Sequence, residues 1–528
     1  EDGQQFLVLI QNELAVLPEE GSTFRSVTVM GSPEANAIPV LGDETISVTL
    51  ETPVYTSDEQ AASTYEKIWT SLRSGASLRL CFNSSGKLEY IYMPSKTASV
   101  SDDNVLVAKN KPTGSNNPFA SLSGGKTPAQ IYKNGIPAEL SDLRQYDVGT
   151  YDKSSDTLFV SDLKLSGLYE NAYPNAAAPS TVTVMGAEPT VLPSAQADLA
   201  AFKVGDKVTL LLTTTGQVAG AVSPDVAKSN AVGVATVDGT KATIELLDGI
   251  LTLEGQTTYS GAAAAKLNGC LVTVSSYKRD YLTLSKVNGK GASTALNLTT
   301  NRMGTKELSA GARFFEQVGN GRLVEIDRSD ITITSIPANK ITYVGYDWAG
   351  RVDKLVLNDV TGDRYDYGII HYQPAGYQET PGNPDGNGEY KNGEISVTNG
   401  SFPKGMPPYV VGSVDGAKTN RMGGVAGSLD QLDGQNRMAA FMPLNEAKGI
   451  RRAQFDTDAM LLTTNSMVIP ISDKVECYNK TTGDWFKPGE DGDHKAALNL
   501  ALAFSDDITV YYDRSPEEGG KVRIVVVE

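Results

Sequence analysis

The feature that most constrains the fold is a strand–turn–strand unit of 22 residues that recurs along the chain. Its clearest copy, at 202–223, alternates apolar and polar residues on both sides of a glycine-containing turn. A period of two is the spacing of a half-buried β-strand, and a glycine turn between two such runs indicates a hairpin. Similar copies occupy 72–93 and 336–357, and a fourth copy with a longer turn occupies 508–526. The sequence therefore predicts a mainly β protein.

A second repeat shows what surrounds these hairpins. The sequence VTVMG occurs at 27–31 and again at 182–186, each time before a hairpin. Between the second copy and its hairpin lies an alanine-rich stretch, 194–202, that predicts a short helix. The corresponding stretch at 58–72 has apolar residues at helical spacing and predicts another helix. We expect several tandem small β-barrel or β-sandwich modules with occasional short helices.

The length of 528 residues predicts three to four domains at roughly 150 residues each. Stretches rich in Ser, Asn, Gly and Pro indicate the breaks between them. The predicted division is a β-module at 1–95 that includes the 58–72 helix, a linker at 96–126, a β-module at 127–228, one or more β-modules at 229–372, a loop or linker at 373–393, and a C-terminal β-module at 394–528.

Composition excludes several classes of function. With 46 basic and 63 acidic residues the net charge is −17, which argues against nucleic acid or an anionic membrane surface as partner. No apolar stretch approaches 18 residues, so no membrane insertion is expected. Cys81, Cys270 and Cys477 form no CxxC pair, which disfavours a zinc or dithiol site, and we expect them to be buried. With only His371 and His494, most histidine-based catalytic or metal sites are excluded.

The search for catalytic residues predicts none. The stretch SGGKT at 123–127 ends like a phosphate-binding loop, but Ala120 stands where that motif needs glycine, so we interpret the stretch as part of the linker. Asp359, Asp363 and Asp366 lie in a sequence typical of a turn. A glycosidase-type acid pair among them is an alternative, but turn geometry explains these residues as well.

Calcium is the one possible cofactor. Asp385, Asn387 and Glu389 alternate in DGNGE, and Asp491 and Asp493 cluster with Glu490 in GEDGDH. Oxygen ligands at alternating loop positions suit a hard cation. Neither stretch completes an EF-hand loop, so a solvated acidic loop is the default interpretation of both.

Two further expectations concern side-chain placement. Aromatic residues near Trp348 or Trp485 could form a sugar-binding platform, although such residues more often pack in the core. The charged residues Lys207, Arg351 and Lys521 are expected at solvent-facing positions of the hairpins, because an exposed sheet edge needs protection against uncontrolled pairing.

Phrases distributed from residue 142 to the end resemble the C-terminal region of S-layer-homology-domain surface proteins from Gram-positive gut bacteria. The resembling segments are 142–175, 180–222, 340–363, 477–486 and 508–528. Proteins of that family usually carry anchor modules that bind a cell-wall polysaccharide, and this anchor pattern is not found here. The resemblance implies an extracellular protein of the bacterial cell surface whose polysaccharide contact is made by modules outside this chain. It carries over no catalytic residue.

The sequence therefore supports three functional hypotheses. The favoured one is a structural, S-layer-type protein that self-assembles into a homo-oligomeric array and is not an enzyme. Tandem modules, the acidic balance and the absence of a catalytic motif favour it. The alternative is an adhesin or glycan-binding surface protein without catalytic activity. The third hypothesis, a wall hydrolase, requires two carboxylates roughly 5 to 10 Å apart in a cleft.

Overall fold

The computed structural model confirms a mainly β protein, with 49% of residues in strands and 9% in helices. The described residues are 7–10, 13–16, 23–29, 33–40, 44–56, 63–69, 72, 77–83, 85–93, 100, 102–112, 116–153, 156–229, 231–259, 263, 266–287, 292–379, 388–432, 435–489 and 492–528.

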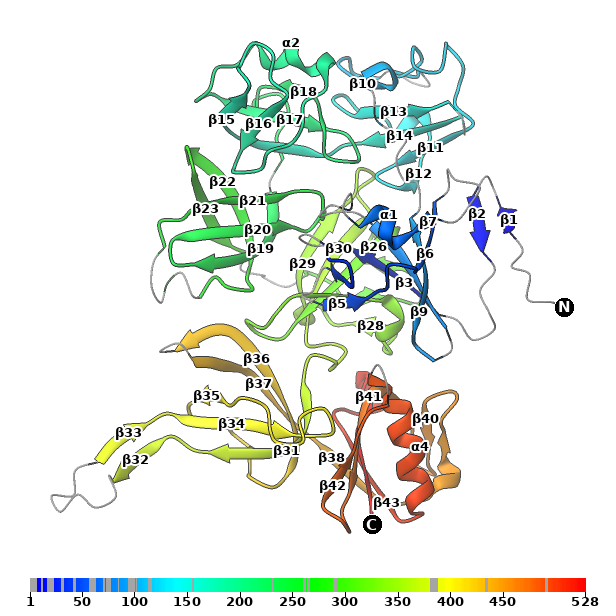
Figure 1. Ribbon diagram of the computed structural model, residues 1–528, viewed down its shortest axis with the longest axis vertical. Coiled ribbons are helices and arrows are strands. Elements are labelled where there is room, and N and C mark those ends of the chain that lie inside the picture. The colour runs from blue at the N-terminus through cyan, green and yellow to red at the C-terminus, as the bar shows by residue number, and fades with distance from the viewer. Residues whose placement is uncertain are drawn as a thin grey trace. The chain divides into compact units, whose positions relative to one another are not determined.

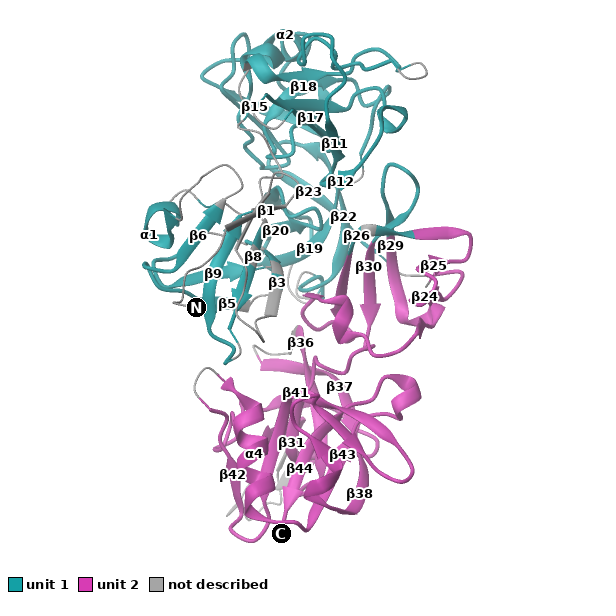
Figure 2. Cartoon of the chain, turned by 90° about the vertical axis from the view of Figure 1, so that its right-hand side faces the viewer, with its two compact units in different colours: residues 1–288, 308–312, 345–353 teal, residues 289–307, 313–344, 354–528 magenta. Residues whose placement is uncertain are grey.

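The chain divides into two compact units, shown in Figure 2. Unit 1 comprises residues 1–288, 308–312 and 345–353, and unit 2 comprises 289–307, 313–344 and 354–528. Each unit contains several sheets, as expected for a chain of small β-modules, and each contains one closed five-stranded barrel.

Unit 1 begins with a five-stranded sheet and two separate hairpins. The sheet has the order β3 (Thr23–Thr28), β8 (Ser77–Phe82), β9 (Leu88–Met93), β6 (Pro53–Thr56) and β7 (Ser63–Thr64). The hairpins pair β1 (Leu7–Ile10) with β2 (Glu13–Val16) and β4 (Ala37–Val40) with β5 (Glu44–Ser47).

The helix predicted at 58–72 is much shorter in the structure. Helix α1 spans Tyr65–Ile68, and 58–62 lie outside the described residues. The two residues before the helix are extended, because Thr64 pairs with Pro53 in the sheet. Tyr65 is buried and donates a hydrogen bond to the carbonyl of Glu34 at 2.7 Å, which fixes the helix over the sheet core.

The next two sheets of unit 1 follow one another along the chain. One has the order β10 (Val105–Val107), β13 (Val148–Asp152), β14 (Thr157–Ser161), β11 (Gln130–Lys133) and β12 (Ile136–Pro137), and the other has the order β16 (Thr181–Val184), β15 (Lys164–Tyr173), β17 (Lys207–Leu212) and β18 (Val218–Val222). The predicted alanine-rich helix appears as a 3₁₀ turn at Pro193–Ala195 followed by α2 (Gln196–Leu199).

The linker predicted at 96–126 is not a linker throughout. Strand β10 pairs with β13 inside a sheet, and the Phe119 side chain is only 1% exposed. The ring of Phe119 packs so closely on Gly149 that a methyl group there would lie 2.6 Å from it. The polar composition of this stretch did not indicate these two contacts. The pairing of β10 with β13 and the packing of Phe119 on Gly149 attach the stretch to the module that follows.

The barrel of unit 1 shares one apolar core with the four-stranded sheet before it. Its strands are, in order around the barrel, β19 (Ala231–Asp238), β20 (Lys241–Leu246), β21 (Thr252–Gln256), β23 (Tyr281–Lys286) and β22 (Leu271–Lys278). The second VTVMG copy makes the connection. Met185 and Gly186 both adopt positive φ, and the Met185 carbonyl accepts a hydrogen bond from the Glu254 amide at 3.1 Å.

A seven-stranded sheet follows in the sequence. It contains β28 (Ser335–Ile336), β24 (Leu296–Asn297), β25 (Arg302–Met303), β26 (Lys306–Gln317), β30 (Val352–Asn358) and β29 (Ile341–Tyr346) in that order, and β27 (Val324–Ile326) pairs with β26. The barrel of unit 2 comes next, formed by β31 (Asp366–Gln373), β34 (Gly393–Thr398), β35 (Tyr409–Val411), β37 (Gln435–Pro443) and β36 (Met422–Leu432).

The loop predicted at 373–393 contains a hairpin instead. Strands β32 (Gly376–Glu379) and β33 (Gly388–Lys391) pair with each other and project beyond the barrel strands in Figure 1. Tyr377 and Tyr390 lie opposite each other in this ladder, whereas half of the Gly and Pro residues fall in 380–387, outside the described residues. Because β31 belongs to the barrel, the predicted boundary at residue 372 also falls within a module.

The C-terminal sheet has a different covering on each face. Its strands are β38 (Asn445–Ile450), β43 (Ile508–Tyr512), β44 (Val522–Val527), β41 (Val468–Asn479), β40 (Leu461–Thr463) and β39 (Phe455–Asp456), with β42 (Asp484–Phe486) paired to β41. Helix α4 (His494–Phe504) packs on one face through Leu498 and Ala501. Residues of the unit 2 barrel pack on the other face against Ile524 and Val526.

All four predicted hairpins are present, as β8–β9, β17–β18, β29–β30 and β43–β44. Of the charged residues expected to face solvent, Lys207 is exposed and Arg351 is half-buried in an ion pair with Asp347 at 2.8 Å. Lys521 is only 8% exposed, so that prediction was wrong. Its partners are described below.

The turn at Gly186 provides a test of the packing between sheet and barrel. A Cβ at Gly186, where φ is +71°, would lie 1.9 Å from the Glu254 carbonyl oxygen, whereas a Cβ at Gly239, where φ is +60°, would meet nothing within 4 Å. We expect Gly239→Ala to cost about 1–2 kcal/mol from backbone strain alone. Gly186→Ala should cost about 1–3 kcal/mol more, because the backbone must also move. Urea unfolding of both variants measures the difference, and equal losses would contradict this packing.

Candidate functional site

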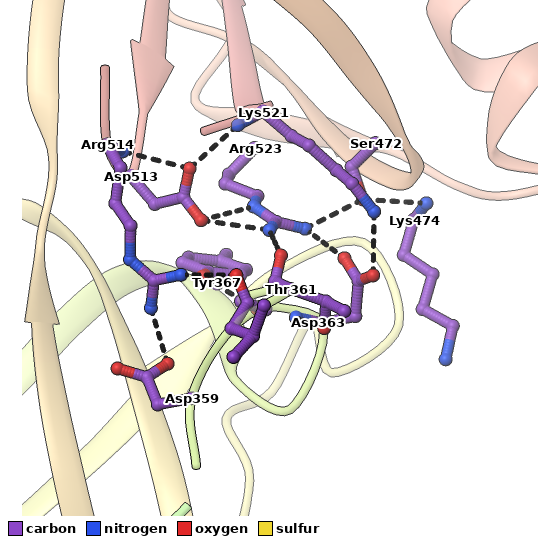
Figure 3. Close-up of polar contacts among 12 residues, drawn as sticks. Asp359, Thr361, Asp363, Tyr367, Ser472, Lys474, Asp513, Arg514, Lys521 and Arg523 are labelled. Carbon is purple, nitrogen blue, oxygen red and sulfur yellow. Dashed lines mark hydrogen bonds and ion pairs between the residues drawn. The ribbon is translucent and has the colours of Figure 1, made fainter. Parts of the chain in front are cut away.

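The acidic turn singled out in the sequence connects β30 to β31 in unit 2, and it lies against the C-terminal strands. There its carboxylates meet cations more than 150 residues away in the sequence, as Figure 3 shows. We call this group the charge cluster; its members are Asp359, Asp363, Asp513, Arg514, Lys521 and Arg523.

A β-bulge places the central arginine. In the β43–β44 ladder Tyr511 lies opposite Ile524 and Tyr512 opposite Val522, so Arg523 has no counterpart. An extra residue of this kind bends the strand and re-aims its side chain. The guanidinium consequently points away from the ladder toward the acidic turn, and the side chain is only 1% exposed.

Every N–H donor of Arg523 has a partner. Nε and Nη2 donate to the Asp513 carboxylate at 3.1 and 2.8 Å, and Nη2 also donates to the Thr361 carbonyl. Nη1 donates to Asp363 and to the hydroxyl of Ser472 at 3.1 Å. A guanidinium has five N–H donors, and all five are used here, which is what a buried charge requires.

The remaining cations complete a balanced set of three positive and three negative groups. Lys521 Nζ lies 2.7 Å from the Asp363 carboxylate, which explains why Lys521 is buried. Arg514 pairs with Asp359 and donates to the Val360 carbonyl at 2.8 Å. Only glycine fits at position 362, because a Cβ there would lie 2.3 Å from Asp513 and 2.4 Å from Arg523.

A buried glutamate holds the same turn from its other side. Glu316 accepts hydrogen bonds from the amides of Val360 and Thr361, at 2.5 and 2.7 Å, and from the Thr361 hydroxyl. Burial raises the pKa of Glu316 even though these hydrogen bonds oppose the shift. The turn is thus fixed between β26 and the C-terminal strands.

The electrostatics of the charge cluster disfavour proton transfer. Burial alone would raise the pKa of the Asp363 carboxyl, but the charges and hydrogen bonds of Arg523 and Lys521 outweigh it and hold that pKa below its usual value. A general acid needs the opposite shift. Asp366, the third candidate, takes no part in the ion pairs of the cluster, and burial raises its pKa. The acid-pair alternative therefore gains no support from this turn.

A second titratable site, which the sequence did not reveal, lies where β41 meets a loop of the unit 2 barrel. Glu476 is 5% exposed and accepts hydrogen bonds from the Gly400 amide at 2.8 Å and the Ser401 hydroxyl at 3.4 Å. Nδ1 of His494 lies 3.9 Å from the Glu476 carboxylate and 3.0 Å from the Val475 carbonyl. Burial raises the pKa of Glu476 to about 7 and lowers the pKa of His494.

The calcium candidates receive little structural description. Asp385, Asn387 and Asp491 lie outside the described residues, as does the side chain of Glu389. Asp493 caps helix α4, with its carboxylate accepting a hydrogen bond from the Ala496 amide at 3.1 Å. Among the described residues, no group of three or more His, Cys, Asp or Glu side chains could hold a metal ion. Calcium binding stays a prediction.

The aromatic candidates pack within the fold. The Trp348 ring lies under the Arg351 guanidinium at 4.7 Å and near Lys133 Nζ at 5.4 Å. Trp485 and Tyr478 are half-buried with ring centroids 4.9 Å apart. This arrangement agrees with the packing interpretation rather than a sugar platform. The three cysteines are buried, as predicted, and form no disulfide with one another.

Each unit contains a pocket. That of unit 1, about 450 Å³, lies beside β10, where Lys109 and Asp198 form an ion pair at 2.6 Å across its lining. That of unit 2, about 240 Å³, is lined by Arg322, Arg364 and Asp366 among others. Each pocket lining contains one carboxylate.

The charge cluster should be essential for stability. Replacing Arg523 by Met leaves Asp363 and Asp513 short of a buried partner, and we expect a loss of about 3–5 kcal/mol in the free energy of unfolding. Arg451→Met is the control, because Arg451 pairs with Asp506 only at an exposed site and its loss should cost less than about 1 kcal/mol. Urea denaturation measures both, and a similar small cost for the two variants would refute the buried network.

Glu476 should make stability depend on pH. Its pKa is raised from the ordinary 4.5, so the protonated carboxyl stabilises the folded protein fully below about pH 4.5, and this contribution is lost as the pH rises through about 7. The loss amounts to about 3 kcal/mol. Glu476→Gln should therefore be more stable than the unaltered protein at pH 8 and about equal to it at pH 4.5. The difference in melting temperature across this range tests it, and a constant difference would contradict the shift.

Comparison with known proteins adds no relationship. No family model matches the chain, and no curated protein or solved structure matches it either. Among the described residues, no helix has the length and apolar character needed to cross a membrane.

Proposed function

We propose that this chain is a structural protein of the bacterial cell surface, an S-layer-type component that self-assembles through its β-modules on a Gram-positive cell wall. The observation that carries the proposal is the charge cluster. Its three cations pair with its three carboxylates, and these ion pairs join one turn to the C-terminal strands. Such a group serves mechanical integrity and leaves no free acid or base for chemistry.

The module design supports the same proposal. Two sheets close into barrels and so have no edges, whereas the C-terminal sheet ends at β38, which pairs with β43 alone among the described strands. An open edge offers unpaired backbone groups to a neighbouring chain. Self-association through such edges, with each copy contacting others in a homo-oligomeric array, gives the chain a partner without any catalytic site.

The net charge of the chain determines which ions the array would need. A net charge of −17 makes neighbouring copies repel one another, so close packing requires cations between carboxylates. Calcium, available outside cells, suits this role because it binds oxygen ligands in flexible geometry. Attachment to cell-wall polysaccharide would be made by modules outside this chain, and neither nucleic acid nor a membrane is proposed as a partner.

One observation favours the alternative, an adhesin or glycan-binding protein. Tyr173, Tyr277 and Tyr390 are each more than half exposed. Exposed aromatic rings can stack on sugars. Binding to a glycan array that is lost when these tyrosines are replaced by Ser would favour this alternative over a purely structural role.

Self-assembly has a direct test. The purified protein with calcium should form ordered sheets or large oligomers in negative-stain micrographs, and chelation should disperse them. Sodium chloride at equal ionic strength is the control, because general charge screening should assemble the protein less well than a bridging divalent ion. Monodisperse monomers under every condition would contradict the proposal.

A further inference from the structure

We propose that the pocket of unit 2 binds a small monocarboxylate that also carries a hydroxyl or amino group. This inference goes beyond the proposed self-assembly and does not depend on it. The pocket measures about 240 Å³ and lies where the start of β31 meets β36 and β37. Its polar lining residues are Arg322, Arg364, Asp366, Tyr409, Ser428 and Asn436.

The surroundings of Arg364 indicate that the pocket binds a ligand. Its Nε is fully shielded from solvent and has no hydrogen-bond partner, and no hydrogen bond or ion pair of Arg364 is found within the described ranges. A shielded polar group without a partner costs free energy comparable to a lost hydrogen bond, and more when it is charged. Arg523, a more deeply buried arginine of the same unit, has all five donors satisfied. The difference indicates a missing anion.

Two of the three anions near Arg364 are already bound by other groups. Glu316 is occupied by the amides of Val360 and Thr361, and Asp363 by Arg523 and Lys521. Both act on Arg364 only through their charge, as does Asp366. The guanidinium therefore keeps its planar fork of donors for another carboxylate, the group whose geometry that fork matches.

The rest of the lining selects the kind of carboxylate. Arg322 adds a second positive charge, and the carboxylate of Asp366 adds a negative one, so the pocket favours an anion of single charge over a divalent phosphate. Asp366 is also the natural acceptor for a ligand hydroxyl or ammonium group. The volume lies below the range typical of drug-sized ligands, which limits the ligand to a few non-hydrogen atoms beyond its carboxylate.

The test uses four probes at equal ionic strength: sodium lactate, glycine, sodium acetate and sodium phosphate, with sodium chloride as reference. Lactate or glycine should raise the melting temperature saturably by a few degrees, acetate less, and phosphate least. Isothermal titration calorimetry should give the same order. If neither lactate nor glycine binds, or if phosphate binds most tightly, the assignment is overturned.

Variants separate a ligand site from a structural arginine. Arg364→Gln should weaken binding of the better probe at least about tenfold. The same variant without ligand should melt no lower than the unaltered protein, because it removes an unpaired charge. Arg302→Gln, which alters a half-exposed arginine paired with Glu307, is the control and should bind normally. A lower melting temperature for Arg364→Gln with unchanged binding would show that Arg364 is structural and would refute the proposal.

Discussion

The buried guanidinium of Arg523 is the interaction on which the organisation of unit 2 depends. It joins the acidic turn between β30 and β31 to two neighbouring strands of the C-terminal sheet, and Glu316 secures the same turn from the other side. An ion network without full satisfaction would destabilise the fold, since desolvation of each charge costs several kcal/mol. Because all five N–H donors of Arg523 are hydrogen-bonded, they offset the cost of burying its charge. They also fix the position of the acidic turn relative to the C-terminal strands.

Two other ionisable groups, one buried and one partly buried, lack that compensation, and the contrast assigns them different roles. Glu476 has hydrogen bonds but no close cation, so burial raises its pKa into the physiological range. Arg364 has no hydrogen bond or ion pair within the described residues, and it borders a pocket. The charge of Arg523 is thus fully paired, the charge of Glu476 depends on pH, and the charge of Arg364 is the one for which we propose a ligand. Only the first contributes unconditionally to stability.

The hairpins were predictable because the pattern that forms them is local. Apolar residues at every second position on both sides of a glycine turn determine both strands and the register between them. The sites were not, because their partners lie far apart in sequence, as Asp363 and Arg523 do. The burial of Lys521 escaped prediction because its partner Asp363 lies far away in the sequence. Polar composition also gave wrong predictions of a linker at 96–126 and a loop at 373–393. The first stretch contains the buried ring of Phe119, and the second contains a hairpin in which Tyr377 pairs with Tyr390.

Amide hydrogen exchange of the native protein tests the central claim, that the charge cluster is a rigid structural element rather than a reactive site. The amides of Val360, Thr361 and Lys521 each donate to a buried carboxylate. We expect these amides to exchange as slowly as the amides of β44, through the same cooperative opening. Rapid exchange of the turn while β44 stays protected would show that the turn opens independently, and it would contradict the account.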